Sequence, residues 1–554
     1  MVCSTATLRT KAHPSIENPG GRASMISLHF PPQFCILLCC SPPSLPLPGP
    51  DTSSDLHVDP LKLIAFVQFS ISVVVLTSVG AAHPMQQRHT PFVPGWVKDA
   101  IFYQIFPERF ANGDPSNDPP GTEAWGGTPT SRNYFGGDLR GIIQHLDYLS
   151  SLGINALYLN PVFLSNSNHK YQTVDYMRID PQFGDEPTFI ELINSCHARG
   201  IRVILDGVFN HTGVEFFAFA DVKKNGAVSR YRDWYFFKGF PVGPVNKPNY
   251  QCWWDYGSLP KLNTACPAVR EYLFDVTRHW MALGIDGWRL DVPNEIPHAF
   301  WIEWRRLVKS INPDAYILGE IWDDGSPWLQ GDQFDGVMNY HFRASCLEFF
   351  ATGSISVSRF DSALARERNA YLPGVSFSLF NLLGSHDTER FLTLCRGDVS
   401  RWKLAVLFQM TYPGAPSIYY GDEVGMTGGK DPECRGTMVW DPAHQNGEML
   451  QFTRRAIALR MKHAVLRGGN FAPLCMDDRT HLYGYVREDP STAAVVLLNR
   501  GEADVRAALP RTHTPGVRSW SQIWPAEGRP YPAAGDSLIV TIPAMSGIVL
   551  EGEK

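Results

Sequence analysis

The stretch GIDGWRLDVPNEI, residues 284–296, places two charges on one side of an apolar strand. Successive side chains of a strand point to opposite faces, so Trp288, Leu290 and Val292 would share one face, with Arg289 and Asp291 on the other. Buried charges are costly unless they are paired or used. A strand with this pattern suits the rim of a closed barrel, where its charged face looks into the barrel and its apolar face packs outward.

Seven further apolar runs of similar length occur between Trp96 and residue 424. They are DAIFYQIF (99–106), NALYLNPV (155–162), IRVILDGV (201–208), AYILGEIW (315–322), FDGVMNY (334–340), LFNLLGSHD (379–387) and PSIYYGDEV (416–424). Amphipathic helical stretches such as 186–200, 269–284 and 300–311 separate the runs. Eight strand–helix units favour a (β/α)8 TIM barrel of the α/β class over a doubly wound sheet, because closure leaves no sheet edge. We expect this barrel to occupy residues 93–445.

Two segments lie outside the strand–helix alternation. The gap 210–263, after the third strand, is too long for an ordinary loop and predicts a small inserted domain. The tail 470–554 follows a long helix over 449–466 and alternates polar and apolar residues, which predicts a C-terminal antiparallel β-sandwich domain.

Residues 1–84 differ from the rest of the chain. They are rich in Pro, Ser and Cys and contain an uncharged apolar run at 63–82 that could serve as a signal or a membrane anchor. We favour the interpretation that Met85 is the biological start. The 11 cysteines form no CxxC pair, which favours reduced thiols and a cytoplasmic enzyme, with a secreted or anchored protein as the alternative.

The charge balance narrows the range of partners. A net charge of −6 and a pI near 6.3 give no electrostatic footprint for nucleic acid or for an anionic membrane surface, and suit a neutral substrate. Aromatic residues make up 12% of the chain, with 15 Trp. These rings could fill the core or stack on the apolar faces of sugar rings, and composition leaves both open.

Polar clusters follow four of the eight strands, at the barrel end where chemistry is expected. They are Asp206 with Asn210 and His211, Arg289 with Asp291, Glu320, and His386 with Asp387. One charge at a strand end is usually an ion pair or a loop anchor, but four converging clusters predict a catalytic site.

The residue types in these clusters suit hydrolysis of a glycosidic bond. That reaction needs one carboxylic acid and one carboxylate, about 5–5.5 Å apart in a retaining enzyme, and Asp291 and Glu320 on neighbouring strands fit this requirement. Arg289 would keep Asp291 ionised, and a less solvated Glu320 could hold a proton near neutral pH. Metal-assisted hydrolysis is the competing use of such carboxylates, but a His-rich ligand set is not evident in the sequence.

Four motifs resemble, in order and spacing, the motif regions of the α-amylase family of glycoside hydrolases: DGVFNH (206–211), GWRLDVPNE (287–295), LGEIW (318–322) and GSHDTER (384–390). The N-terminal part of the barrel (96–120) and LPKLN (259–263) are most similar to the neopullulanase, cyclomaltodextrinase and maltogenic amylase branch. The resemblance runs from Trp96 to the end. It implies a retaining hydrolase that cleaves α-1,4-glucosidic bonds of maltooligosaccharides, cyclodextrins or pullulan, with transglycosylation as an alternative outcome.

The resemblance also implies a role for each matching residue. Asp291 would be the nucleophile, Glu320 the general acid and base, and Asp387 the third catalytic carboxylate. The residues implied to contact substrate are His169, Tyr171, His211, Arg289, Asn294, Glu295, Trp322, His386, Asp431 and Arg435, with Asp206 and Asn210 bracing the pocket from behind. Asp431 and Arg435 would bind the next sugar on the non-reducing side, and Asn294, Glu295 and Trp322 would border the leaving group.

The segment NGDPSNDP supplies four closely spaced oxygen donors: Asn112, Asp114, Asn117 and Asp118. By itself such a segment is usually a polar turn, although oxygen ligands on one loop also suit Ca2+. The resemblance implies a structural calcium site here, completed by the Gly136 carbonyl and Asp138.

Two features depart from the branch. Residues 1–84 do not resemble its N-terminal β-sandwich, so its homodimer and its cyclodextrin preference do not follow for this chain. Pro293 stands where the branch usually has Ala, beside the leaving-group side. The rival interpretations are a membrane-anchored transporter heavy chain, whose barrel lacks a complete catalytic set, and an oligo-α-glucosidase or sucrose-acting relative.

Overall fold

The structure is a computed structural model that describes residues 93–554, apart from 511, 513–514, 527 and 532–536. The predictions for residues 1–84, namely the apolar run at 63–82 and the start at Met85, concern residues outside this part. No helix within the described residues has both the length and the hydropathy to cross a bilayer.

Eight parallel strands form the central sheet, in the order β8-β7-β6-β5-β2-β1-β10-β9. They are β1 (Phe102–Ile105), β2 (Ala156–Leu159), β5 (Arg202–Gly207), β6 (Gly287–Leu290), β7 (Tyr316–Gly319), β8 (Gly336–Val337), β9 (Phe380–Leu382) and β10 (Ala415–Tyr419). A parallel bridge between Met338 and Phe380 joins the two ends of the sheet. The predicted (β/α)8 barrel is therefore confirmed.

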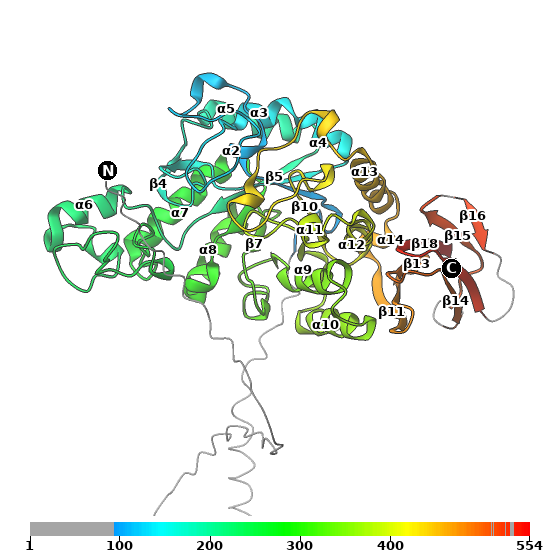
Figure 1. Cartoon of the computed structure of the whole chain (residues 1–554). Coiled ribbons are helices and arrows are strands. Elements are labelled where there is room, and N and C mark those ends of the chain that lie inside the picture. Colours follow the sequence, from blue (N-terminus) through cyan, green and yellow to red (C-terminus); the bar gives the residue numbers. More distant parts are fainter. Residues whose placement is uncertain (1–92, 511, 513–514, 527, 532–536) are drawn as a thin grey trace, which may run out of the picture. The chain divides into compact units, whose positions relative to one another are not determined.

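Helices surround the barrel strands (Figure 1). They are α2 (Pro107–Phe110), α3 (Leu139–Gln144), α4 (Leu146–Leu152), α5 (Glu186–His197), α7 (Pro267–Ala282), α8 (His298–Ile311), α9 (Tyr340–Cys346), α10 (Val357–Ala370), α11 (Phe391–Leu394), α12 (Val399–Thr411), α13 (Gly447–Lys462) and α14 (Val465–Gly468). Trp280, Trp288, Trp301 and Trp304 are fully buried in the layer between strands and helices. These tryptophans therefore belong to the core, where truncating such a side chain to Ala typically costs about 3–5 kcal/mol.

The opening stretch forms a shorter strand than its pattern predicts. Trp288 and Leu290 of β6 pack outward and Arg289 is buried inside, as expected, but the strand ends at Leu290. Val292 has a left-handed φ of 36°, so its expected place on the apolar strand face is wrong. A β-branched residue rarely adopts this conformation, which here turns the chain sharply beside the barrel rim.

The left-handed turn also explains why a proline fits at position 293. This residue begins the short 3-10 helix η6 (Pro293–Glu295), where its fixed φ suits the helix start and no backbone N–H is needed. Its carbonyl accepts a hydrogen bond from Trp301 Nε1 (2.9 Å), which ties the turn to α8.

The segment between β5 and α7 contains α6 (Phe217–Asn225), the short helix η5 (Trp253–Asp255) and isolated antiparallel bridges such as Phe237 with Tyr250. Its loops lie at one side of the barrel (Figure 1). Lys261 joins this segment to the barrel, because its Nζ donates to Asn210 Oδ1 (2.8 Å) and to Glu295 Oε2 (2.9 Å). A second, smaller excursion forms the antiparallel pair β3 (Phe163–Ser165) and β4 (Thr173–Ile179).

The C-terminal part is antiparallel, as predicted. Its larger sheet has the order β11-β12-β13-β18-β15-β16, and β14 pairs with β17. The strands are β11 (Asn470–Asp477), β12 (Leu482–Glu488), β13 (Thr492–Asn499), β14 (Val505–Pro510), β15 (Trp520–Trp524), β16 (Arg529–Tyr531), β17 (Ser537–Ile542) and β18 (Ser546–Glu553). The helix expected over 449–466 is broken at His463 into α13 and α14.

Candidate active site

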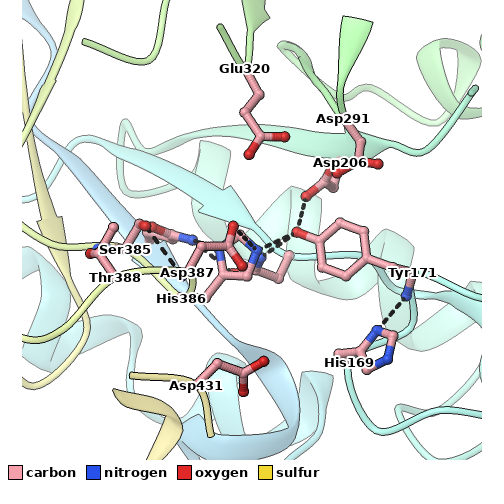
Figure 2. Close-up of polar contacts among 12 residues, drawn as sticks. His169, Tyr171, Asp206, Asp291, Glu320, Ser385, His386, Asp387, Thr388 and Asp431 are labelled. Carbon is pink, nitrogen blue, oxygen red and sulfur yellow. Dashed lines mark hydrogen bonds and ion pairs between the residues drawn. The ribbon is translucent and has the colours of Figure 1, made fainter. Parts of the chain in front are cut away.

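Arg289 lies at the centre of the barrel mouth and pairs with three carboxylates. Its Nη1 contacts Asp206 (2.8 and 2.9 Å) and Asp291 Oδ1 (3.1 Å), and its Nη2 lies 2.7 Å from Glu320 Oε2. The sequence paired Arg289 with Asp291 and with substrate, and the structure adds that Arg289 bridges Asp291 and Glu320. Figure 2 shows these two side chains entering the site from neighbouring strands.

Burial and mutual repulsion dominate the electrostatics of this pair. Burial raises the pKa of Asp291, and the charge of Glu320 raises it further, against the opposing effect of Arg289. Burial also raises the pKa of Glu320, although Arg289 lowers it and the Val292 N–H donates to Glu320 Oε2 (3.2 Å). Two carboxyls that face each other in a buried pocket titrate as one system, and we expect the pair to retain a proton above the usual carboxyl range.

His386 and Tyr171 form the floor of the pocket. Their rings are stacked with an interplanar angle of 7°, and Tyr171 Oη lies 2.7 Å from His386 Nε2. Gln104 Nε2 donates to His386 Nδ1 (2.8 Å), so Nε2 is the ring nitrogen that can donate to Tyr171 and Asp387. Tyr171 Oη in turn donates to Asp206 (2.9 Å), and this chain of hydrogen bonds fixes the Tyr171 ring (Figure 2).

Asp387 is held in its charged form. Burial alone would raise its pKa, but His386, Arg435 and Arg289 together lower it well below the usual range. Its Oδ2 lies 3.0 Å from His386 Nε2 and its Oδ1 lies 3.0 Å from Arg435 Nη2. Arg435 also pairs with the exposed Asp431 (3.2 Å), so the structure brings these predicted residues together on one side of the pocket.

Two histidines offer neutral polar groups to a ligand. Burial lowers the pKa of both His169 and His211 to about 3. His169 Nδ1 accepts the backbone N–H of Tyr171 (3.2 Å), which leaves the proton on Nε2. His211 Nε2 is buried without a hydrogen-bond partner, 4.0 Å from Asp291 Oδ2, where a bound hydroxyl could satisfy it.

The predicted leaving-group side consists of Trp322 and η6. Trp322 is 47% exposed, donates from Nε1 to Glu320 Oε1 (3.1 Å) and stacks on Tyr340 at 3.6 Å. Glu295 is held by Lys261, whereas Asn294 is exposed. The braces expected behind the pocket are present, because Asp206 and Asn210 are fully buried against Arg289 and Lys261, respectively.

Sequence reasoning missed four residues of this network. Tyr158 donates to Asp206 (2.7 Å), Asn160 links Gln104 to Tyr171, and the buried Tyr340 hydroxyl lies near Glu320 and Ser385. Gln104 and Tyr158 occupy inward positions of β1 and β2. A polar side chain at an inward position near a strand end is the signal that could have found them.

The predicted calcium residues form a separate cluster of oxygen atoms. Asn112 Nδ2 donates to Asp118 (2.9 and 3.1 Å), and a Cβ on Gly136, whose φ is 80°, would lie 2.2 Å from Asp118 Oδ1. Asn117 Nδ2 lies 3.4 Å from Asp138 Oδ2. Asn112 Oδ1 and Asn117 Oδ1 are buried without hydrogen-bond partners, which fits oxygen ligands that await a hard cation.

Asp114 differs from the other members of this cluster. Its carboxylate accepts hydrogen bonds from Ser116 N (3.1 Å) and Oγ (2.6 Å) at the start of the short helix η2 (Pro115–Asn117), and the side chain is exposed. Asp138 has a second structural contact, because it caps α3 through Gly141 N (2.6 Å). Burial raises the pKa of both Asp138 and Asp118, and a bound cation would oppose this effect.

Comparison with known proteins supports this geometry. Residues 104–464 match the family described as "Alpha amylase, catalytic domain". The chain is 54% identical over 431 residues to neopullulanase 2 of Thermoactinomyces vulgaris (77% of this chain, 73% of that protein) and 52% identical over 419 residues to cyclomaltodextrinase of Geobacillus thermopakistaniensis (75% and 71%).

A solved structure agrees with these relatives. Cyclic α-maltosyl-(1→6)-maltose hydrolase of Arthrobacter globiformis, in complex with cyclic α-maltosyl-(1→6)-maltose, superposes with a TM-score of 0.77 at 42% identity. The match covers 83% of this chain and 99% of that one. The predicted family and branch are thereby confirmed, and the chain belongs to the α-amylase family of glycoside hydrolases.

Proposed function

We propose that this α-amylase family hydrolase cleaves α-1,4-glucosidic bonds in short α-glucans, cyclodextrins and pullulan with retention of the anomeric configuration. The observation that carries the proposal is the bridge of Asp291 and Glu320 by two nitrogens of Arg289, at 3.1 and 2.7 Å. One guanidinium fork keeps both carboxyls close together. A retaining mechanism needs such a pair about 5–5.5 Å apart, whereas inversion needs a wider gap for water.

In this mechanism Asp291 attacks the anomeric carbon and forms a covalent glycosyl-enzyme, while Glu320 protonates the departing glycosidic oxygen. Glu320 then takes a proton from water, which hydrolyses the intermediate. Asp387, kept charged by His386 and Arg435, would accept hydroxyl hydrogen bonds from the same sugar. Tyr171, fixed by Asp206 and His386, would stack on the sugar ring.

The reactive form is the one in which the shared proton sits on Glu320. Arg289, Val292 N–H and Trp322 Nε1 all stabilise negative charge on Glu320 in the structure. The positive charge that develops on the sugar ring during the reaction would favour the Asp291 anion, and the glycosidic oxygen would accept the proton of Glu320. The transition state is therefore reached from one of the two proton positions of the coupled pair, the one with the proton on Glu320.

The test is a product analysis of the purified full-length protein. Proton NMR of the first product from maltotriose reports whether the α-anomer appears first, as retention requires. Hydrolysis of β-cyclodextrin, pullulan and maltotriose separates this activity from that of an oligo-α-glucosidase, which would release only glucose from chain ends. A β-anomer as the first product, or no new reducing ends from any of the three substrates, contradicts the proposal.

We also propose that Asn112, Asn117, Asp118, Gly136 and Asp138 bind a structural Ca2+. The two buried amide oxygens without partners support the site, and calcium would stabilise the loop around η2 without entering the chemistry. Saturation at about 100 times Kd would add about 2.7 kcal/mol to stability. Differential scanning calorimetry should show a lower Tm in EDTA, restored by CaCl2, and no calcium response in Asp118→Asn; an identical Tm in EDTA and CaCl2 contradicts the site.

We propose a cytoplasmic location. The seven cysteines of the described residues are free thiols, and several of them are buried. None takes part in the proposed mechanism. Free thiols suit a reducing compartment. Fractionation of native cells, followed by N-terminal sequencing of the isolated protein, tests the location together with the predicted start at Met85; recovery from the membrane fraction contradicts it.

A further inference from the structure

A hollow of about 490 Å³ lies on the barrel outside the catalytic pocket. Its walls include the aromatic side chains of Trp125, Phe135, His145 and Trp440, together with the carboxylates of Asp118 and Glu123. Hollows that bind small molecules typically measure about 300–1,000 Å³ and combine aromatic walls with a few polar groups. This hollow therefore has the size and the lining of a binding site.

The two tryptophan rings are fixed in place. Trp125 Nε1 donates to Met438 O (2.9 Å) and Trp440 Nε1 donates to Phe110 O (2.6 Å). Trp440 also stacks on His145 with ring centroids 3.8 Å apart. Rings that are already immobilised lose little entropy when a ligand packs on them, so the walls are preorganised.

The polar groups of the hollow are mainly hydrogen-bond acceptors. Glu123 contributes carboxylate oxygens, whereas the Asp118 carboxylate already accepts from Asn112 and belongs to the proposed calcium site at the edge of the hollow. His145 Nδ1 donates to Gly141 O (2.8 Å), which leaves Nε2 as an acceptor in the neutral ring. The lining contains no Lys or Arg within the described residues. This combination disfavours an anion and suits a neutral ligand with many hydroxyl donors and an apolar ring face, which is the chemistry of a saccharide.

We propose that this hollow is a second α-glucan binding site, separate from the catalytic pocket. The choice of an α-glucan rests on the proposed function, because the substrate is the saccharide that the protein would meet. The two sites are linked through the ends of α2: Phe106, just before this helix, contacts His386 (6.4 Å between ring centroids), and Ala111, just after it, lines the hollow. A chain bound in the hollow would raise the local concentration of glucan near the catalytic pocket.

The test uses the full-length Asp291→Asn protein, in which hydrolysis is suppressed, and isothermal titration with maltopentaose. Two binding events are expected. Adding Trp125→Ala should weaken one of them about tenfold, because a stacked ring contributes roughly 1.4 kcal/mol, and should leave the other unchanged. Glu123→Gln changes an exposed residue and keeps the side-chain shape, and it should weaken the same binding event. This variant therefore still tests the site if Trp125→Ala disturbs folding.

Phe240→Ala, which removes another partly exposed ring (40%), is the matched control and should change neither event. A single binding event that Trp125→Ala and Glu123→Gln leave unaltered overturns the second site, while hydrolysis by the wild-type protein still supports the proposed function. Tetramethylammonium chloride is the other probe, because aromatic rings beside carboxylates also suit an organic cation. Binding of this cation with no second maltopentaose event likewise overturns the saccharide assignment.

Discussion

Buried arginines lie in two different environments in this protein, one made of carboxylates and the other of backbone carbonyls. Arg289 at the barrel mouth and Arg460 and Arg487 at the C-terminal end of α12 are all fully buried. Arg289 faces Asp206, Asp291 and Glu320. Arg460 and Arg487 instead donate to backbone carbonyls, including Gly414 O (2.5 Å) and Thr411 O (2.7 Å), respectively.

The two environments have opposite electrostatic consequences. Burial lowers the pKa of Arg289, but Asp206 and Glu320 outweigh this effect and raise it well above its usual value. Burial lowers the pKa of Arg460 to about 9, with Arg487 and Arg467 adding repulsion. Carbonyl dipoles at a helix C-terminus can hold a cation in place, but only carboxylates form a site whose charge can move during a reaction.

The strongest test of this contrast is Asp291→Asn. The amide keeps the shape and the contact with Arg289 but cannot form the glycosyl-enzyme, so kcat on β-cyclodextrin should fall by about 10⁴-fold or more. A reducing-sugar assay measures the loss, and calorimetry should show an unchanged or slightly higher Tm because one buried charge is removed. The matched control, the exposed Asp332→Asn, should retain full activity. Residual activity above about a tenth would remove Asp291 from the mechanism.

The next effect concerns pH. Activity needs the coupled pair with one proton, so it falls at low pH, when both carboxyls are protonated, and at high pH, when the second proton is lost. Because burial raises the pKa of Asp291 and of Glu320, both limbs should lie above the usual carboxyl range.

Glu320→Gln should lower kcat about 10³-fold on natural substrates and remove the alkaline limb. The acid limb, which reports Asp291, should stay. The profile is measured with p-nitrophenyl α-maltoside, whose leaving group needs little protonation. An alkaline limb that persists in Glu320→Gln would assign the second proton to another group.

The barrel could be predicted from the sequence because buried strands appear as apolar runs, and eight such runs alternate with amphipathic helical stretches. Sequence reasoning also found the residues at the strand ends, since alternation in β6 separates Arg289 from Trp288 and Leu290. It could not find the turn at Val292, because a valine with a φ of 36° contradicts its own local preference and is held there by tertiary contacts. It paired Arg289 with Asp291 and missed the contact with Glu320, because Asp291 is a near neighbour in the sequence and Glu320 lies 31 positions away.

Arg289→Lys sharpens the comparison through geometry. The lysine keeps a positive charge, but its single nitrogen replaces the planar guanidinium, whose Nη1 contacts Asp291 and whose Nη2 contacts Glu320, so the fixed geometry of the bridge is lost. We expect kcat/KM to fall about 10²-fold, the loss typical of one misplaced electrostatic contact. The expected change lies mainly in kcat, because the bridge positions the reacting carboxyls. A variant with wild-type kcat would show that charge alone, without the fork, is sufficient.

Of these variants, Arg487→Met should change catalysis least, but it should clearly lower stability. Methionine fills part of the volume but leaves the carbonyls of Thr411 and Gly469 without this donor, whereas Leu466 O keeps Arg460 Nη1 (3.2 Å); the expected cost is about 3 kcal/mol. Calorimetry should show a lower Tm, while kcat/KM on β-cyclodextrin stays within about twofold at temperatures where the variant is folded. Arg487→Lys should recover part of the stability, because an ammonium can reach some of the same carbonyls. If Arg487→Met instead lowered kcat without lowering Tm, these carbonyl-bound arginines would be coupled to the barrel mouth, and the division between a reactive cation and structural cations would not hold.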